Sequence, residues 1–151
     1  MLYLIAITIV ILDQVSKFAA IKYLKGHSPY IIVENLFQLC YVENYGAAFG
    51  ILQNRKIFFV IVTFIVIISI VFFLVRYNHS INKPLKIGLV MLLAGAIGNL
   101  IDRIRFGYVV DFISFKLAGS YDFPVFNVAD IFIVAGTLLI MTLIMFNKHE
   151  Y

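Results

Sequence analysis

Two aspartates of this 151-residue chain, Asp111 and Asp130, lie at or beside apolar segments and have no basic residue at helical pairing distance. Two carboxylates brought together in a partly desolvated site cannot both ionise easily, so one keeps a proton while the other acts as a base. Such a pair can take a proton from water, direct the water at an amide carbonyl and protonate the departing nitrogen. The structural alternatives are a turn residue for Asp111 and a helix N-terminal charge for Asp130, where the helix dipole favours a carboxylate.

Two further polar sets lie in apolar surroundings, where an ionisable side chain costs at least about 2.5–3.5 kcal/mol. Asp13 and Lys17 are four residues apart with the acid first, which is the favourable order for a helical ion pair. Asn99, Asp102 and Arg103 share one helical face, and Arg103 is placed to hold a carboxylate with two parallel hydrogen bonds. Both sets are interpreted either as structural pairs that orient helices or as groups that position a substrate.

Other chemistries lack their signatures in this sequence. It contains no HExxH, GxSxG, P-loop or GxGxxG motif, and its three histidines are isolated. Cys40 is the only cysteine, and we interpret it as a small buried apolar residue. We therefore expect no metal site and no cofactor. The net charge of +4 is scattered between apolar runs, which indicates contact with lipid headgroups and not with nucleic acid.

The elements that must position these residues are expected to be transmembrane helices. The chain is 63% hydrophobic and 13% charged, with a mean hydropathy of +1.01, whereas soluble domains are about 45–50% apolar and about 25% charged. A membrane span takes roughly 20 helical residues. We expect an all-α membrane protein forming one domain over residues 1–151, with a bundle of four spans at about 2–24, 57–75, 85–104 and 128–146. The first span has no basic leader and no cleavage site, so we interpret it as a retained helix.

Two connections are long enough to have structure of their own. The segment 26–54 is rich in β-branched and aromatic residues, which predicts a small β cradle at the membrane surface. The segment 105–127 mixes aromatic residues with Gly and Pro, and we expect a loop with a short surface helix there.

Helices that cross a membrane in alternation bring the unusual polar residues together. The C-terminal ends of the first and third spans lie on the same side as the N-terminal ends of the second and fourth. This places nine polar residues in one leaflet: Asp13, Lys17, Asn44, Asn99, Asp102, Arg103, Asp111, Asn127 and Asp130. The Lys and Arg count is eight on that side and four on the other, which by the positive-inside rule puts the polar cluster in the cytoplasm.

Five blocks of this sequence resemble the lipoprotein signal peptidases (signal peptidase II) of bacteria. In chain order they are Asp13-Gln14-Val15-Ser16-Lys17, Asn44-Tyr45-Gly46-Ala47-Ala48-Phe49, Gly98-Asn99-Leu100-Ile101-Asp102-Arg103, Val109-Val110-Asp111-Phe112 and Phe126-Asn127-Val128-Ala129-Asp130. The blocks extend from the first span to the fourth, so the resemblance covers nearly the whole chain. It implies a metal-independent aspartic endopeptidase that removes signal peptides from diacylglyceryl-modified prolipoproteins, cutting just before the lipidated cysteine.

The resemblance also implies roles for individual residues. Asp111 and Asp130 match the catalytic pair, and the matching substrate-binding or site-supporting positions are Asp13, Lys17, Asn44, Gly46, Asn99, Asp102, Arg103 and Asn127. It implies a multi-pass protein of the bacterial cytoplasmic membrane with cytoplasmic termini and a site near the outer leaflet, opposite to the literal charge count. The expected partners are the lipid-modified substrate and membrane lipids, with no obligate protein partner. Phe49, Phe112 and Phe126 are candidates for contacting the lipid or shielding the site, and interfacial packing is the alternative.

Two rival functions are weighed against this interpretation. A small ion- or proton-coupled transporter would use intramembrane Asp and Lys as a relay, and predicts polar residues through the membrane depth and internal repeats. The sequence shows its polar residues at one side and no repeat. A non-catalytic membrane scaffold leaves Asp111 and Asp130 without an explanation.

Overall fold

The computed structural model describes residues 2–46, 56–117 and 121–146. Its four helices are each long and apolar enough to cross a membrane: α1 (Leu2–Leu24), α2 (Lys56–Arg76), α3 (Lys83–Arg105) and α4 (Val128–Phe146). Their bounds agree with the expected spans to within two residues at either end. The bundle of four apolar helices with a small sheet confirms the expected fold class.

Helix α3 is the centre of the bundle, because it packs against α1, α2 and α4. Small residues permit this close packing, as they do between membrane helices in general. At Gly95 an added Cβ would lie 2.5 Å from the carbonyl oxygen of Ala129, and at Gly136 it would lie 2.6 Å from the carbonyl oxygen of Gly88. The backbones of α3 and α4 therefore touch, whereas Ile70 is the one fully buried residue of α2, most of whose apolar side chains are exposed.

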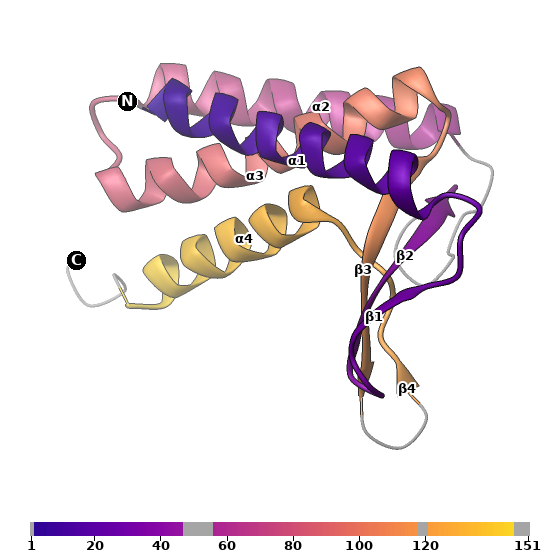
Figure 1. Ribbon diagram of the computed structural model, residues 1–151. Helices are drawn as coiled ribbons and strands as arrows, with labels where there is room; N and C mark the ends of the chain where they lie inside the picture. The colour runs from indigo at the N-terminus through magenta and orange to yellow at the C-terminus, as the bar shows by residue number, and fades with distance from the viewer. Residues whose placement is uncertain (1, 47–55, 118–120, 147–151) are drawn as a thin grey trace.

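A small antiparallel sheet projects from one end of the bundle, with its strands running across the helix direction (Figure 1). Its strand order is β1 (Tyr30–Val33), β2 (Phe37–Asn44), β3 (Val109–Leu117) and the two-residue β4 (Tyr121–Asp122). The N-terminus and the C-terminal end of α4 both lie at the opposite end of the bundle (Figure 1). The strand-like pattern of segment 26–54 is thus confirmed by β1 and β2.

The second connection differs from our expectation, since its described residues form strands and no surface helix. Residues 109–117 pair with β2, and Phe37 lies opposite Phe115 with the two rings stacked 4.7 Å apart. Phe126 adds a bridge to Ile113. The prediction of a helix was wrong because both faces of β3 carry apolar side chains, which hides the two-residue period of a strand.

The two faces of β3 have different neighbours, and this difference positions the site. Val110 and Phe112 are buried with Ala20 in a core beneath the sheet, at the end of α1. Because successive side chains of a strand point to opposite faces, Asp111 points away from this core. Phe112 consequently packs against the bundle and does not line the site.

Candidate active site

Asp111 lies on β3 directly opposite Val42 of β2, and its side chain is only 2% exposed. Two side-chain amides hold its carboxyl group. Nδ2 of Asn44 donates to Oδ2 at 2.9 Å, and Nδ2 of Asn127 donates to Oδ1 at 2.6 Å. The backbone N–H of Gly46 donates to Oδ1 of Asn44 at 3.0 Å, which fixes the amide so that its nitrogen faces Asp111.

Asp130 lies in the first turn of α4 and is joined to Asn127 by a reciprocal pair of hydrogen bonds. The backbone N–H of Asn127 donates to Oδ2 of Asp130 at 3.2 Å, and the backbone N–H of Asp130 donates to Oδ1 of Asn127 at 3.0 Å. This arrangement resembles a capping box, in which two helix N-terminal donors are satisfied at once. Asn99 on α3 completes the environment by donating from Nδ2 to Oδ1 of Asp130 at 2.8 Å. Asn127 therefore contacts both aspartates.

The environment of Asp111 favours its protonated form. Burial away from water, followed by the nearby charge of Asp130, raises the pKa of Asp111 from 3.8 to about 7. The hydrogen bonds from Asn44 and Asn127 act in the opposite direction and limit the rise. A carboxyl group with this pKa can hold a proton at neutral pH and release it within the same pH range.

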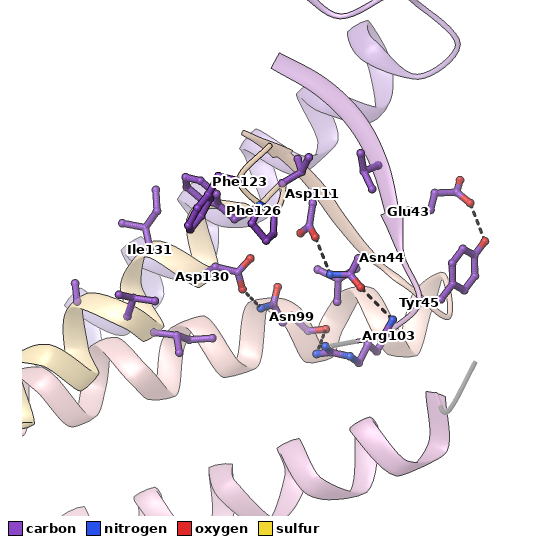
Figure 2. Close-up of a pocket in the computed structure, with 18 of the residues that line it drawn as sticks. Glu43, Asn44, Tyr45, Asn99, Arg103, Asp111, Phe123, Phe126, Asp130 and Ile131 are labelled. Atoms are coloured by element: carbon purple, nitrogen blue, oxygen red, sulfur yellow. Dashed lines mark hydrogen bonds between the residues drawn. The ribbon is translucent and has the colours of Figure 1, made fainter. Parts of the chain in front are cut away.

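A buried charge cluster lies beside the aspartate pair. Lys17 is 2% exposed, and its ammonium lies 3.0 Å from Oδ2 of Asp13, 3.1 Å from Oδ2 of Asp102 and 2.9 Å from Oδ1 of Asn99. These three acceptors match the three donors of an ammonium group, which a buried lysine needs. Because Asn99 accepts from Lys17, its amide nitrogen is oriented toward Asp130 (Figure 2).

The cluster also holds the backbone next to each aspartate of the pair. Oδ1 of Asp13 accepts from the N–H of Ala129 at 2.9 Å, and Oδ2 of Asp102 accepts from the N–H of Val110 at 3.1 Å. Ala129 directly precedes Asp130, and Val110 directly precedes Asp111. The two buried carboxylates thus fix the chain positions from which Asp130 and Asp111 project.

Gln14 is a member of this cluster that our sequence analysis missed. Its Nε2 lies within 3.1–3.2 Å of Asp13 Oδ2, the carbonyl oxygen of Gly98 and Oδ1 of Asp102. The sequence feature that could have indicated this role is its position next to Asp13 in the first of the five blocks. Gly98 leaves no room for a side chain, because an added Cβ would overlap the Asp13 carboxylate.

Arg103 is placed differently from our expectation. Its guanidinium forms no ion pair within the described residues, donates a long hydrogen bond of 3.5 Å to the carbonyl oxygen of Asn99 and lies 5.3 Å from the ring centre of Phe59. The prediction that it grips a carboxylate was wrong, because Lys17 reaches Asp102 from α1 in its place.

The aspartate pair lies at the polar end of a cavity of about 960 Å³ (Figure 2). Asn44, Asn99 and Arg103 line this end together with both aspartates. Glu43, Tyr45 and Gly46 at the end of β2 also line the cavity. The wall along α4 and the chain before it is apolar, through Phe123, Phe126, Ile131, Val134, Ala135 and Leu138. Of the three aromatic candidates, Phe126 lines the cavity, Phe112 does not, and Phe49 lies outside the described residues. Water at the polar end of this cavity would meet two carboxyl groups held by three side-chain amides.

The family model described as Signal peptidase (SPase) II matches residues 5–146 of this sequence. The chain belongs to the signal peptidase II family. It is therefore a peptidase, which confirms both the family resemblance and the enzyme class expected from the five sequence blocks.

Curated relatives and solved structures agree with membership of the signal peptidase II family. The chain is 47% identical over 140 residues to a lipoprotein signal peptidase of Caldanaerobacter subterraneus, covering 92% of each chain. It is 40% identical over 152 residues to the lipoprotein signal peptidase of Clostridioides difficile, covering 99% of each. A solved bacterial membrane enzyme has a TM-score of 0.90 at 36% identity, with 99% of this chain and 90% of that one covered. The four apolar helices agree with this similarity to a membrane enzyme.

Proposed function

We propose that the chain is an intramembrane aspartic endopeptidase in which Asp111 and Asp130 activate a water molecule. Its substrate in this proposal is a diacylglyceryl-modified bacterial prolipoprotein, cut just before the lipidated cysteine. The observation that carries the proposal is the pair of carboxyl groups that Asn127 contacts together, at the polar end of an apolar cavity. The name of the relatives, lipoprotein signal peptidase, supports the substrate class.

The chemistry follows from one proton shared by two carboxyl groups. The ionised aspartate takes a proton from water as the water oxygen attacks the scissile carbonyl carbon, while the protonated aspartate donates to the carbonyl oxygen. Collapse of the tetrahedral intermediate returns this proton and delivers the other to the departing nitrogen. A pKa of about 7 at Asp111 supports this scheme, because the pair can keep its proton near neutral pH.

The cavity suits a substrate that arrives from the bilayer. Its apolar wall along α4 would accept acyl chains or a signal helix, and its polar end would receive the peptide bond. Because Arg103 has no carboxylate partner within the described residues, its N–H groups are available to substrate carbonyl oxygens. In our proposal Asn44, Asn99, Arg103 and Asn127 orient the peptide, while Asp13, Lys17, Gly46 and Asp102 support the site.

We further propose that residues 1–151 act as one domain in the cytoplasmic membrane, with both termini in the cytoplasm. The site and the sheet then lie near the outer leaflet, the side to which a lipid-modified precursor is exported. The arrangement of the helices supports a common side for the termini, since both ends lie opposite the sheet (Figure 1). Water must reach a bond held at the membrane surface, and a site at the end of the bundle meets this need.

The test is cleavage of a synthetic diacylglyceryl-modified prolipoprotein by the purified protein in detergent. We expect cleavage before the lipidated cysteine, no cleavage of the same peptide without the lipid, and loss of activity by at least about a hundredfold in Asp111→Asn and Asp130→Asn. Glu34→Gln is the control, since Glu34 is an exposed carboxylate on the β1–β2 turn. Full activity in either aspartate variant removes that residue from the mechanism. No cleavage by the folded protein, where a known signal peptidase II works, rejects the proposed substrate and cleavage site.

A further inference from the structure

The back of β2 carries a second hydrogen-bonded cluster, separate from the aspartate pair. Because strand residues alternate between faces, the Glu43 side chain points away from Asn44 and Asp111 (Figure 2), although Glu43 is among the residues that line the cavity. Its carboxylate accepts from the hydroxyl of Tyr45 at 2.7 Å, from Nζ of Lys25 at 3.0 Å and from the hydroxyl of Tyr41 at 3.1 Å. The Glu43 side chain is 29% exposed, and its carboxylate receives three hydrogen-bond donors from the protein.

Tyr108 joins this cluster to the chain that leads into β3. Its hydroxyl lies 3.1 Å from that of Tyr41, and its ring centre lies 5.2 Å from that of Tyr45. We call the set Lys25, Tyr41, Glu43, Tyr45 and Tyr108 the Glu43 clasp. It connects the residue after α1, the end of β2 and the turn between α3 and β3.

The clasp is charged over the whole pH range in which the site can work. The hydrogen bond from Tyr45, followed by that from Lys25, lowers the pKa of Glu43 to about 2. The carboxylate is therefore ionised near neutral pH, and its hydrogen bonds do not change when the aspartate pair gains or loses its proton.

Asn44 lies between two members of the clasp, Glu43 before it and Tyr45 after it. Its own side chain points the other way and donates to Asp111 at 2.9 Å. The pairing of β2 with β3 ends here, with Asn44 opposite Val109. A strand end normally frays, so something must hold the Asn44 backbone if the bond to Asp111 is to persist.

We propose that Glu43 is a positioning residue that acts through Asn44 on the Asp111 carboxyl group. The clasp anchors the backbone on both sides of Asn44 and so fixes the amide that faces the reacting pair. The inference rests on the proposed function, because its catalytic consequence requires Asp111 to take part in the reaction.

The proposal has a consequence for the pH dependence of cleavage. The hydrogen bond from Asn44 lowers the pKa of Asp111, against the larger effects of burial and of the Asp130 charge. Loosening Asn44 therefore raises the pKa of Asp111 further. The other groups that act on Asp111 are Asn127, the more distant charge of Lys17 and the charge of Arg103 in the same cavity, and within the described residues no hydrogen bond or ion pair joins any of these to the clasp.

The experiment compares Glu43→Ala with Glu34→Ala, which removes the same charge from the exposed turn of the same sheet. We expect kcat of Glu43→Ala to fall on the order of tenfold, less than the hundredfold that a displacement of about 1 Å can cause. The basic limb of its pH–kcat profile moves to higher pH, as it does in Asn44→Ala. The double variant Glu43→Ala/Asn44→Ala resembles Asn44→Ala alone, because both changes remove the same contact. Glu34→Ala leaves kcat and the profile unchanged.

Two outcomes overturn the proposal: an unchanged pH profile in Glu43→Ala, which a merely structural role would also give, or additive effects in the double variant. Tyr41→Phe, which removes one hydroxyl, provides a milder variant if Glu43→Ala is unstable, with a smaller shift in the same direction. Amide hydrogen exchange at residues 42–46 is a readout that needs no cleavage. Faster exchange in Glu43→Ala than in Glu34→Ala supports the clasp even if the proposed function fails, and equal exchange rejects it.

Discussion

The side-chain amide of Asn127 donates to Asp111 Oδ1 at 2.6 Å, a shorter hydrogen bond than any other at the site. The same residue caps α4 and exchanges backbone and side-chain hydrogen bonds with Asp130. The beginning of a transmembrane helix is thereby tied to a strand of the sheet. Asn127 therefore contacts both carboxyl groups, that of Asp111 through its side-chain amide and that of Asp130 through its backbone N–H, and it is an informative residue to change.

Asn127→Ala should impair chemistry more than folding. We expect cleavage to fall by roughly ten- to a hundredfold, because Asp111 loses its shortest hydrogen bond and the backbone N–H of Asp130 loses its acceptor. The basic limb of the pH profile should move to higher pH, since the Asn127 hydrogen bond lowers the pKa of Asp111. Asn82→Ala is the matched control, because Asn82 caps α3 at the far end of the bundle and accepts from the N–H of Leu85 at 2.9 Å. It should cost about 1 kcal/mol of stability and leave the profile unchanged.

The raised pKa of Asp111 should appear in the thermal stability of the protein. Between the ordinary aspartate pKa of 3.8 and about 7, the folded chain holds a proton that the unfolded chain has released. Rising pH therefore favours unfolding, and the stability from this group is lost as pH passes through about 7. We expect the Tm of the wild type to fall relative to Asp111→Asn between about pH 4 and pH 7, where stability declines by up to about 1.4 kcal/mol per pH unit, and to level off above about pH 7. Parallel Tm curves for the two proteins would contradict the shift.

Lys17 should be needed for folding because of the two carboxylates it neutralises. Lys17→Met leaves Asp13 and Asp102 buried without a counter-charge, and we expect a loss of about 3–5 kcal/mol. Combining it with Asp13→Asn and Asp102→Asn should recover part of this loss, as measured by thermal unfolding in detergent. Lys22→Met, on the exposed next turn of α1, is the control and should change stability little. An equally stable Lys17→Met protein would show that the carboxylates are not charged.

The proposed orientation can be tested with two cysteines in a Cys40→Ser background. Tyr30→Cys places a thiol on the exposed strand β1, and Ser80→Cys places one on the exposed turn between α2 and α3. A membrane-impermeant maleimide added to whole cells should label the first and not the second. The reverse pattern would place the site in the cytoplasm, as the literal charge count does. Lys17 and Arg103 lie within helices, and without them that count is six against four.

Much of this architecture was predictable because a bilayer makes strict demands on sequence. The lengths of the apolar segments predicted the four helices. The alternating directions of those helices predicted that Asp13, Asn99 and Asp130 lie at the same end of the bundle, as they do. The connection at 105–127 was not predictable in the same way. The cross-strand stack of Phe37 on Phe115 joins segments far apart in the sequence, and nothing local in either segment indicates the pairing.

At the site, sequence spacing predicted contacts within one helix but not contacts between elements. The Asp13–Lys17 pair was predicted from its separation along one helix, and the structure confirms it at 3.0 Å. The expected two-pronged grip of Arg103 on a carboxylate is absent from the described residues, where Asp102 pairs with Lys17 of α1. The Glu43 clasp escaped notice because its members come from three parts of the chain. The catalytic roles of Asp111 and Asp130 remain predictions.

The hydrogen bonds that hold the two aspartates come from β2, α3 and α4, and through Lys17 and Asp13 from α1. Helix α4 is the last span to be synthesised, and it supplies both Asp130 and, just before its start, Asn127. If Asp111 and Asp130 act as proposed, a chain whose fourth helix is not yet inserted lacks one carboxyl group of the pair and the amide that holds the other. Proteolytic activity would then begin only once α4 has packed against α3.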